Sequence, residues 1–333
     1  MNRSSLRVAV WIAGFTLLAA LLLAVRWWIT VAADRSLPLA PSTVIIPRGA
    51  SFDDVAAILR RRGIIGDATA FRLYARLIHA DTAVRAGEYE IQAHTTPAAV
   101  LKMLTTGTGQ VAVWVTIPEG FTAAQIARRL QRDGIGPAGA YERYFMHHSL
   151  DVDGWRTRTL EGVLFPDTYL FPAGASPRLV AHVMTAQFLR ELPADAAARA
   201  RALGFTLPQI ITIASMIERE AKVDAERPLM ASVYYNRLRL GMPLQVDATI
   251  EYALPHHADV ITRRDLEIDS PYNTYLHRGL PPTPIANPGL PSLLAALHPA
   301  KTDYLYYVYK GGGRHAFART YAEQQANIAR YER

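Results

Sequence analysis

An uncharged apolar run near the N-terminus constrains this chain more than any other feature. Residues 8–25 contain no charged side chain, and two tryptophans and Ile29 continue the run beyond Arg26. About 20 apolar residues are enough to cross a bilayer as a helix. An arginine at the end of such a run can reach the head groups, and tryptophans favour the membrane interface. We therefore expect a single transmembrane anchor over residues 8–33.

Positive charge before this run sets the expected orientation. Arg3 and Arg7 precede it, with no acidic residue nearby. Basic residues that flank a membrane span stay in the cytoplasm. Residues 1–7 should therefore be cytoplasmic, and residues 34–333 should lie outside the cytoplasm, in the periplasm or on the outer face of the membrane. The alternative is a cleaved signal peptide, but its apolar core has only about 7–15 residues, and Arg26 would be out of place near a cleavage site.

Composition narrows the classes of function. The chain has 333 residues, enough for two or three domains, and no cysteine, which excludes disulfides, thiolate metal sites and a cysteine nucleophile. The net charge of +7 comes without a long basic block, so we expect an anionic polymer or membrane as partner and no nucleic acid. Because the body should lie outside the cytoplasm and lacks phosphate-binding motifs, we expect no cofactor.

Two stretches about seventy residues apart repeat one pattern. Residues 44–64 and 115–135 each read as a β-strand, a Pro–Gly turn, a Ser or Thr cap and an amphipathic helix ending at glycine. The pattern resembles the LysM class of small carbohydrate-binding modules, although a plain strand–helix unit fits equally well. We expect an α+β fold, with a LysM-like domain at 40–110 and a larger mixed domain at 111–333. Residues 304–320 predict a β-hairpin.

A capped helix carries the most promising acidic residues. A Thr-x-x-Gln capping box opens a helix over residues 206–220. At about 100° per residue, Glu218 and Glu220 lie about 200° apart, each at a border of the apolar face. At most one can point into a given cleft, and partial desolvation there suits a general acid. The alternative is that both are surface residues paired with nearby bases. The opposite, polar face should hold Thr212, Ser215 and Arg219.

Polar and aromatic side chains gather in turns downstream of this helix. Five of the 21 prolines lie between residues 281 and 291, which stiffens the chain there and lowers the cost of ordering a binding surface. Tyrosine rings and amide groups suit sugar rings and N-acetyl groups, although a loop packed only for stability is equally compatible. The candidate contact residues are Gln245, Asp247, Tyr272, Asn273, Thr274 and Tyr275.

Several motifs in register resemble one enzyme family. They occur in the same order and at similar spacing over nearly the whole chain, together with the anchor and the LysM-like region. The chain thereby resembles the MltG (YceG-like) endolytic murein transglycosylases. The motifs are LEGVLFPDTY at 160–169, ASMIERE at 214–220, SVYYNRL at 232–238, LQVD at 244–247, YNTY at 272–275, GLPP at 279–282 and HPAKT at 298–302.

This resemblance implies an inner-membrane enzyme that cuts peptidoglycan glycan strands internally, at the MurNAc–GlcNAc bond, and leaves a 1,6-anhydro-MurNAc end. It places the catalytic glutamate of the family on Glu218. One carboxyl is enough as acid and base, because the muramic C6 hydroxyl replaces the water that ordinary glycosidases activate with a second carboxylate. Glu220 and the loop residues are candidates for orienting or contacting the sugars, although Glu220 can instead pair with a nearby base. Peptidoglycan synthases are implied partners.

Three other functions remain open at the level of the sequence. A hydrolytic muramidase would use Glu218 with Asp247 as second carboxylate and would leave a reducing end. An anchored wall-binding scaffold would need no catalysis. A zinc hydrolase would rest on His147–His148 and residues 256–259, but adjacent histidines point apart and no His-x-x-x-His helix exists, so we expect no metal.

Overall fold

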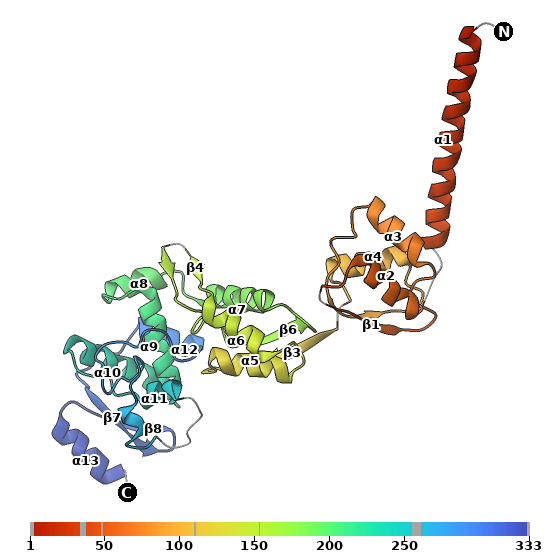
Figure 1. Cartoon of the computed structure of the whole chain (residues 1–333). Coiled ribbons are helices and arrows are strands. Elements are labelled where there is room, and N and C mark those ends of the chain that lie inside the picture. Colours follow the sequence, from red (N-terminus) through yellow and green to blue (C-terminus); the bar gives the residue numbers. More distant parts are fainter. Residues whose placement is uncertain are drawn as a thin grey trace. The chain divides into compact units, whose positions relative to one another are not determined.

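The computed structural model describes residues 3–33, 38–47, 49–109, 111–152, 154–254 and 261–331. Helices and short antiparallel strands are mixed along the chain (Figure 1), which confirms the predicted α+β class. The chain forms two compact units. Unit 1 comprises residues 1–113 with 172–174, and unit 2 comprises residues 114–171 with 175–333.

Unit 1 is built around one small antiparallel sheet. Strands β1 and β2 pair with Val44 opposite Tyr89. Tyr89 and Leu59 are fully buried in a core that also takes side chains from the helices. The elements of unit 1 are α1 (Arg3–Ala33), β1 (Ser42–Ile46), α2 (Phe52–Arg61), α3 (Ala68–Leu77), β2 (Gly87–Ile91) and α4 (Pro97–Thr106).

Both copies of the repeated pattern form the expected strand, turn and capped helix. In the first, the Ser51 side chain accepts from the Asp54 N–H and the Asp54 carboxylate accepts from the Ser51 N–H. In the second, Thr122 and Gln125 form the same reciprocal pair at the start of α5 (Ala123–Arg132). Reciprocal caps satisfy N–H groups that a helix start would otherwise leave unpaired.

Unit 2 surrounds the buried helix α9 (Leu207–Glu220). Helices α10 (Arg227–Arg239) and α12 (Leu290–Leu297) pack against it. Strand β3 (Ala112–Thr116) pairs with β6 (Thr168–Pro172), and β7 (Tyr306–Gly311) pairs with β8 (Arg314–Ala318) as the predicted hairpin. The other elements are α6 (Ala138–His147), β4 (Asp151–Val152), β5 (Trp155–Arg156), α7 (Pro177–Glu191), α8 (Ala196–Ala202), η1 (Asp224–Glu226), α11 (Asp247–Ala253), η2 (Asp265–Glu267) and α13 (Tyr321–Tyr331).

The prediction that Thr212, Ser215 and Arg219 form a polar face of α9 is wrong for the first two residues. Thr212 and Ser215 are 5% and 0% exposed. Their hydroxyls donate to carbonyls of their own helix, Thr212 to Pro208 at 3.0 Å and Ser215 to Thr212 at 2.7 Å. A hydroxyl satisfied in this way can be buried at little cost, so polarity alone does not place it at the surface. Arg219 remains partly exposed.

Among the residues that the structure describes with their side chains, no single helix is long and apolar enough to cross a membrane. Within α1 these residues form a shorter apolar helix, Trp11–Arg26. Helices α8 and α9 follow each other with a bend of 90° between them. Together they are long and apolar enough to cross a membrane, judged by length and composition alone. The predicted anchor extends beyond Trp11–Arg26 on both sides, because residues 1–2 and the side chains of residues 3–10 and 27–33 lie outside the described part.

Candidate active site

Glu218 lies in the last turn of α9 and is almost completely enclosed. Its side chain is 6% exposed. One carboxylate oxygen lies 3.3 Å from a guanidinium nitrogen of Arg227, and the other accepts the Gly289 N–H at 3.0 Å. Arg227 begins α10, pairs also with Asp224 at 3.0 Å and donates to Ser292. A buried carboxylate with two fixed partners is held in one orientation.

A second acidic residue stands next to Glu218, and the sequence analysis missed it as a site residue. Glu119 occupies the turn of the second repeat, where the first repeat has Arg48. The turn is fixed by Gly120, which has φ +77° and donates its N–H to the Asn287 carbonyl at 2.9 Å. The carboxyl group of Glu119 is partly shielded from water, which raises its pKa. The charge of Glu218 raises that pKa further. The sequence signal that could have identified Glu119 is the change of charge between the two turns, from Arg48 in the first repeat to Glu119 in the second.

Glu220 has different surroundings from Glu218. Its carboxylate accepts from the Tyr307 hydroxyl at 3.3 Å, and that hydroxyl also lies 3.2 Å from the Tyr234 hydroxyl. Burial raises the pKa of Glu220 to about 7, and the charge of Asp247 contributes to the rise. The two glutamates of α9 therefore contact different partners, as their separation around the helix predicts.

Two of the six candidate loop residues have buried side chains. Asn273 is 0% exposed and donates to the Leu266 and Ile268 carbonyls, both at 2.9 Å. Thr274 is 2% exposed, and its hydroxyl oxygen accepts the Val246 N–H at 3.0 Å. Both side chains therefore hold the loop together.

The other four candidates reach the surface fully or in part. Gln245 and Asp247 are exposed, and Gln245 has φ +53°. The Tyr275 hydroxyl donates to the Asp247 carboxylate. The Tyr272 hydroxyl lies 2.7 Å from that of Thr283. The structure thus brings Asp247 and Tyr275 together on the side of Glu220.

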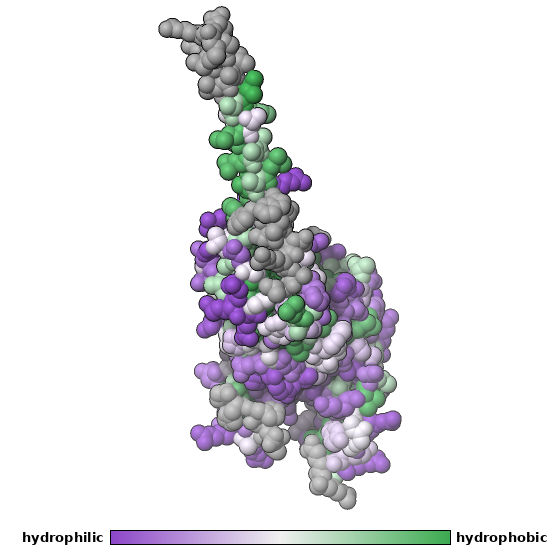
Figure 2. Space-filling model, turned by 90° about the vertical axis from the view of Figure 1, so that its right-hand side faces the viewer, coloured by the Kyte–Doolittle hydropathy of each residue, from purple (hydrophilic) through white to green (hydrophobic). Residues whose placement is uncertain are grey.

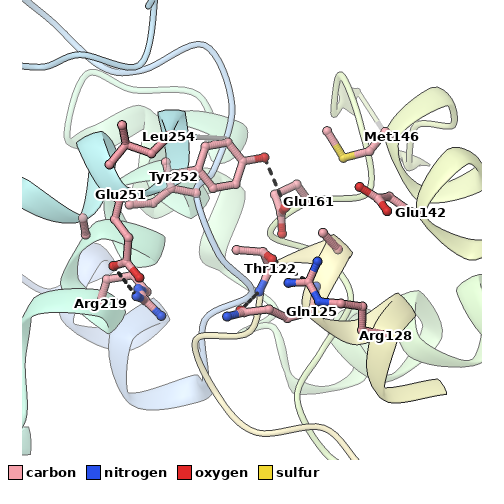
Figure 3. A pocket seen from close by; sticks show the side chains of 13 residues that line it. Thr122, Gln125, Arg128, Glu142, Met146, Glu161, Arg219, Glu251, Tyr252 and Leu254 are labelled. Atoms are coloured by element: carbon pink, nitrogen blue, oxygen red, sulfur yellow. Dashed lines mark hydrogen bonds and ion pairs between the residues drawn. The ribbon is translucent and has the colours of Figure 1, made fainter. Parts of the chain in front are cut away.

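A polar pocket of about 620 Å³ adjoins the end of α9. Arg219 lines it and pairs with Glu251 at 2.6 Å, while Tyr252 donates to Glu161 at 3.2 Å. Glu161 is 1% exposed, and burial raises its pKa to about 7. The sequence analysis had Glu161 only as part of a motif. Figure 3 shows Arg219, Glu251 and Tyr252 across the pocket from Arg128, Glu142 and Met146.

The zinc hypothesis has no support in the described part of the chain. No group of three or more His, Asp or Glu side chains is placed there to hold a metal ion. His256, His257 and Asp259 lie outside the described residues.

The family follows from comparison with known proteins. The model of the YceG-like family matches residues 44–330, which is most of the chain. The chain therefore belongs to the YceG-like family, as its motifs predict. A solved structure of a putative YceG-like protein from Listeria monocytogenes shares 31% sequence identity, with a TM-score of 0.57 over 86% of this chain and 98% of that one.

Three curated relatives of the chain share one name. The endolytic murein transglycosylase of Bacillus subtilis is 34% identical over 310 residues, which cover 86% of this chain and 83% of that protein. The protein of the same name from Streptococcus pneumoniae serotype 2 is 30% identical over 322 residues. The alignment covers 87% of this chain but only 58% of the pneumococcal protein.

The raised pKa of Glu220 predicts a pH-dependent stability. In the folded chain this carboxyl keeps its proton up to about pH 7, against an ordinary pKa of 4.5, so the folded state binds more protons between these values. Its contribution to the free energy of unfolding therefore falls as pH rises from about 4.5 to about 7. Urea unfolding of Glu220→Gln across this range should show a shallower fall than the wild type. An unchanged slope, equal to that of the exposed-residue control Asp151→Asn, would contradict it.

Proposed function

We propose that this chain is an endolytic lytic transglycosylase that cleaves the MurNAc–GlcNAc bond within glycan strands. The names of its relatives support the reaction class. The observation that carries the assignment is the Glu218 carboxyl, 6% exposed and fixed by Arg227 and Gly289. An enclosed carboxyl in one orientation suits proton transfer to a single substrate atom.

Glu218 serves this reaction as acid and then as base. Its proton passes to the glycosidic oxygen while the bond from that oxygen to muramic C1 breaks. The resulting carboxylate then takes the proton of the muramic C6 hydroxyl, whose oxygen bonds to C1 and closes the 1,6-anhydro ring. No water is consumed, and Glu218 ends protonated as it began. The Gly289 N–H and Arg227 stabilise the carboxylate between the two steps.

The surface candidates take the sugar contacts in this proposal. Gln245, Asp247, Tyr272 and Tyr275 have polar groups or rings that reach solvent. Asn273 and Thr274 support the loop from inside. Glu220 orients this region through Tyr307, and its pKa of about 7 also makes it the rival candidate for the acid.

Mass spectrometry of the released muropeptides tests the reaction. The wild type should give anhydro-MurNAc ends from uncross-linked glycan strands. Glu218→Gln removes the transferable proton, so it should lower the rate by at least about 100-fold. Glu220→Gln, an identical change two residues away, should retain most of the activity.

Each other outcome has a distinct meaning. Reducing ends from the wild type would show a hydrolytic muramidase. Loss in Glu220→Gln with activity retained in Glu218→Gln would exchange the roles of the two glutamates. Binding without cleavage by the wild type would favour the scaffold.

We also propose that α1 anchors the chain in the inner membrane with unit 2 on the periplasmic side, within reach of peptidoglycan synthases. An apolar helix exposed on all sides needs a nonpolar environment. Figure 2 shows apolar side chains along the described part of this helix. The exposed large apolar residues are Trp11, Ile12, Phe15, Leu17, Leu18, Leu21, Leu22 and Leu23.

Membrane fractionation tests the anchor. The full chain should stay with membranes after an alkaline carbonate wash, and its intact mass should include residues 1–33. The same chain with a cleavable signal peptide in place of residues 1–33 should be released. A mature N-terminus near residue 34 in the native chain would instead establish a signal peptide.

Unit 1 is proposed to be LysM-like and to bind glycan. Its strand–helix–helix–strand order with antiparallel β1 and β2, and its separate core, support a small independent module.

A buried charge in the unit 1 core tests glycan binding. In the Glu218→Gln background, Leu59→Asp puts a carboxylate at a 0% exposed position and should unfold unit 1. Binding to insoluble peptidoglycan should fall severalfold. Leu77→Asp, the same change at a 55% exposed leucine, should leave it unchanged. Equal binding by both variants would contradict a role for unit 1.

A further inference from the structure

A second carboxylate stands beside Glu218 because residue 289 is glycine. A Cβ built on Gly289 would overlap the Glu119 carboxyl and lie 2.9 Å from Glu119 Cγ. The backbone of Gly289, with φ −77° and ψ 171°, is one that any residue adopts. Glycine therefore leaves open the space that the Glu119 carboxyl occupies, and a larger residue would displace that side chain. The same residue donates its N–H to Glu218, so both carboxyl groups touch one backbone position.

The turn that carries Glu119 is held against the end of α9. Gly120 donates to the Asn287 carbonyl, and Asn287 donates its backbone N–H to the Phe121 carbonyl, both at 2.9 Å. The Arg219 guanidinium donates to the Gly120 carbonyl at 3.4 Å. These contacts fix the Glu119 backbone from two segments. Glu119 itself is exposed, whereas the Glu218 side chain is enclosed, so Glu119 lies on the solvent side of the pair.

Acidic charge exceeds basic charge around the pair. Arg227 is shared between Glu218 at 3.3 Å and Asp224 at 3.0 Å, and its charge also acts on Glu119. Two carboxylates thus share one guanidinium, whose charge acts on the third at longer range, and neighbouring like charges resist losing every proton. Although Glu119 is exposed as a residue, its carboxyl is partly shielded from water, and this partial desolvation, followed by the charge of Glu218, raises its pKa. The other groups facing the pair are Arg219 from α9 and the neutral Ser292 from α12.

We propose that Glu119 is a positioning residue of the reaction: seated against Gly289, its carboxyl lies beside that of Glu218 and favours the protonated form of this acid. This inference rests on the proposed function, because an acid catalyst must hold a proton at the working pH. Glu119 acts through Glu218 and does not replace it.

The pH profile of the full chain in detergent micelles tests the pair. In Glu119→Gln the alkaline limb of kcat/KM should move to lower pH by about one unit, because the neighbouring charge is gone. Gly289→Ala keeps the N–H but displaces Glu119, so it should shift the limb in the same direction. The double variant should shift no further than Glu119→Gln alone. Asp151→Asn should leave the limb in place.

Carbon-13 NMR of the glutamate carboxyls separates the two proposals, since it needs no turnover. The Glu218 signal should titrate in two coupled steps in the wild type and in one step in Glu119→Gln. An unmoved limb, or a rate lowered equally at all pH values, would overturn the role of Glu119. An identical Glu218 titration in both proteins would do the same. Coupled titration in a wild type that releases no anhydro ends would uphold the pair and overturn the proposed function.

Discussion

The buried side-chain amide of Asn287 holds together the segments that form the candidate site. Its oxygen accepts the Gly162 and Leu164 N–H groups, both at 2.9 Å. Its nitrogen donates to the Phe121 carbonyl at 2.9 Å and to the Glu161 carboxyl at 2.8 Å. All four hydrogen-bonding positions of the amide are therefore used at a residue that is 0% exposed. Because a buried amide with a missing partner is costly, this network specifies one arrangement of the segments.

The constraint extends from this network to α9. Glu161 accepts the Ala123 N–H at the start of α5, where the helix end leaves donors free. Gly162 follows with φ +90°, and a Cβ there would lie 2.5 Å from Pro284 and 2.9 Å from Ile211 of α9. Only glycine accommodates both the backbone angle and the close approach. The position of the Glu119 turn relative to Glu218 thus depends on contacts made well below the surface.

Sequence rules about neighbouring residues correctly predicted the features that neighbouring residues determine. The helix caps, the C-terminal hairpin and the separation of Glu218 from Glu220 all follow from neighbours within a few residues. The burial of Thr212 and Ser215 did not follow, because segments distant in the sequence decide it. The Ile285 N–H, for example, donates to the Ser215 hydroxyl at 3.1 Å. Nor did the Glu119–Gly289 contact, which joins two turns from distant parts of the sequence. Periodicity describes the faces of one element and carries no information about which distant turn packs against them.

The duplicated pattern shows that one local structure can have different roles in the two units. In both copies a strand, a turn and a reciprocally capped helix form in the same order. In unit 1 the helix closes a small separate core, and the turn carries a basic residue in the sequence. In unit 2 the corresponding turn carries Glu119 and is bonded to the segment that also supplies Gly289. An exchange of charge in the turn, together with a glycine that leaves room for it, places a carboxyl of the second repeat beside that of Glu218, where the first repeat has a basic side chain in the sequence.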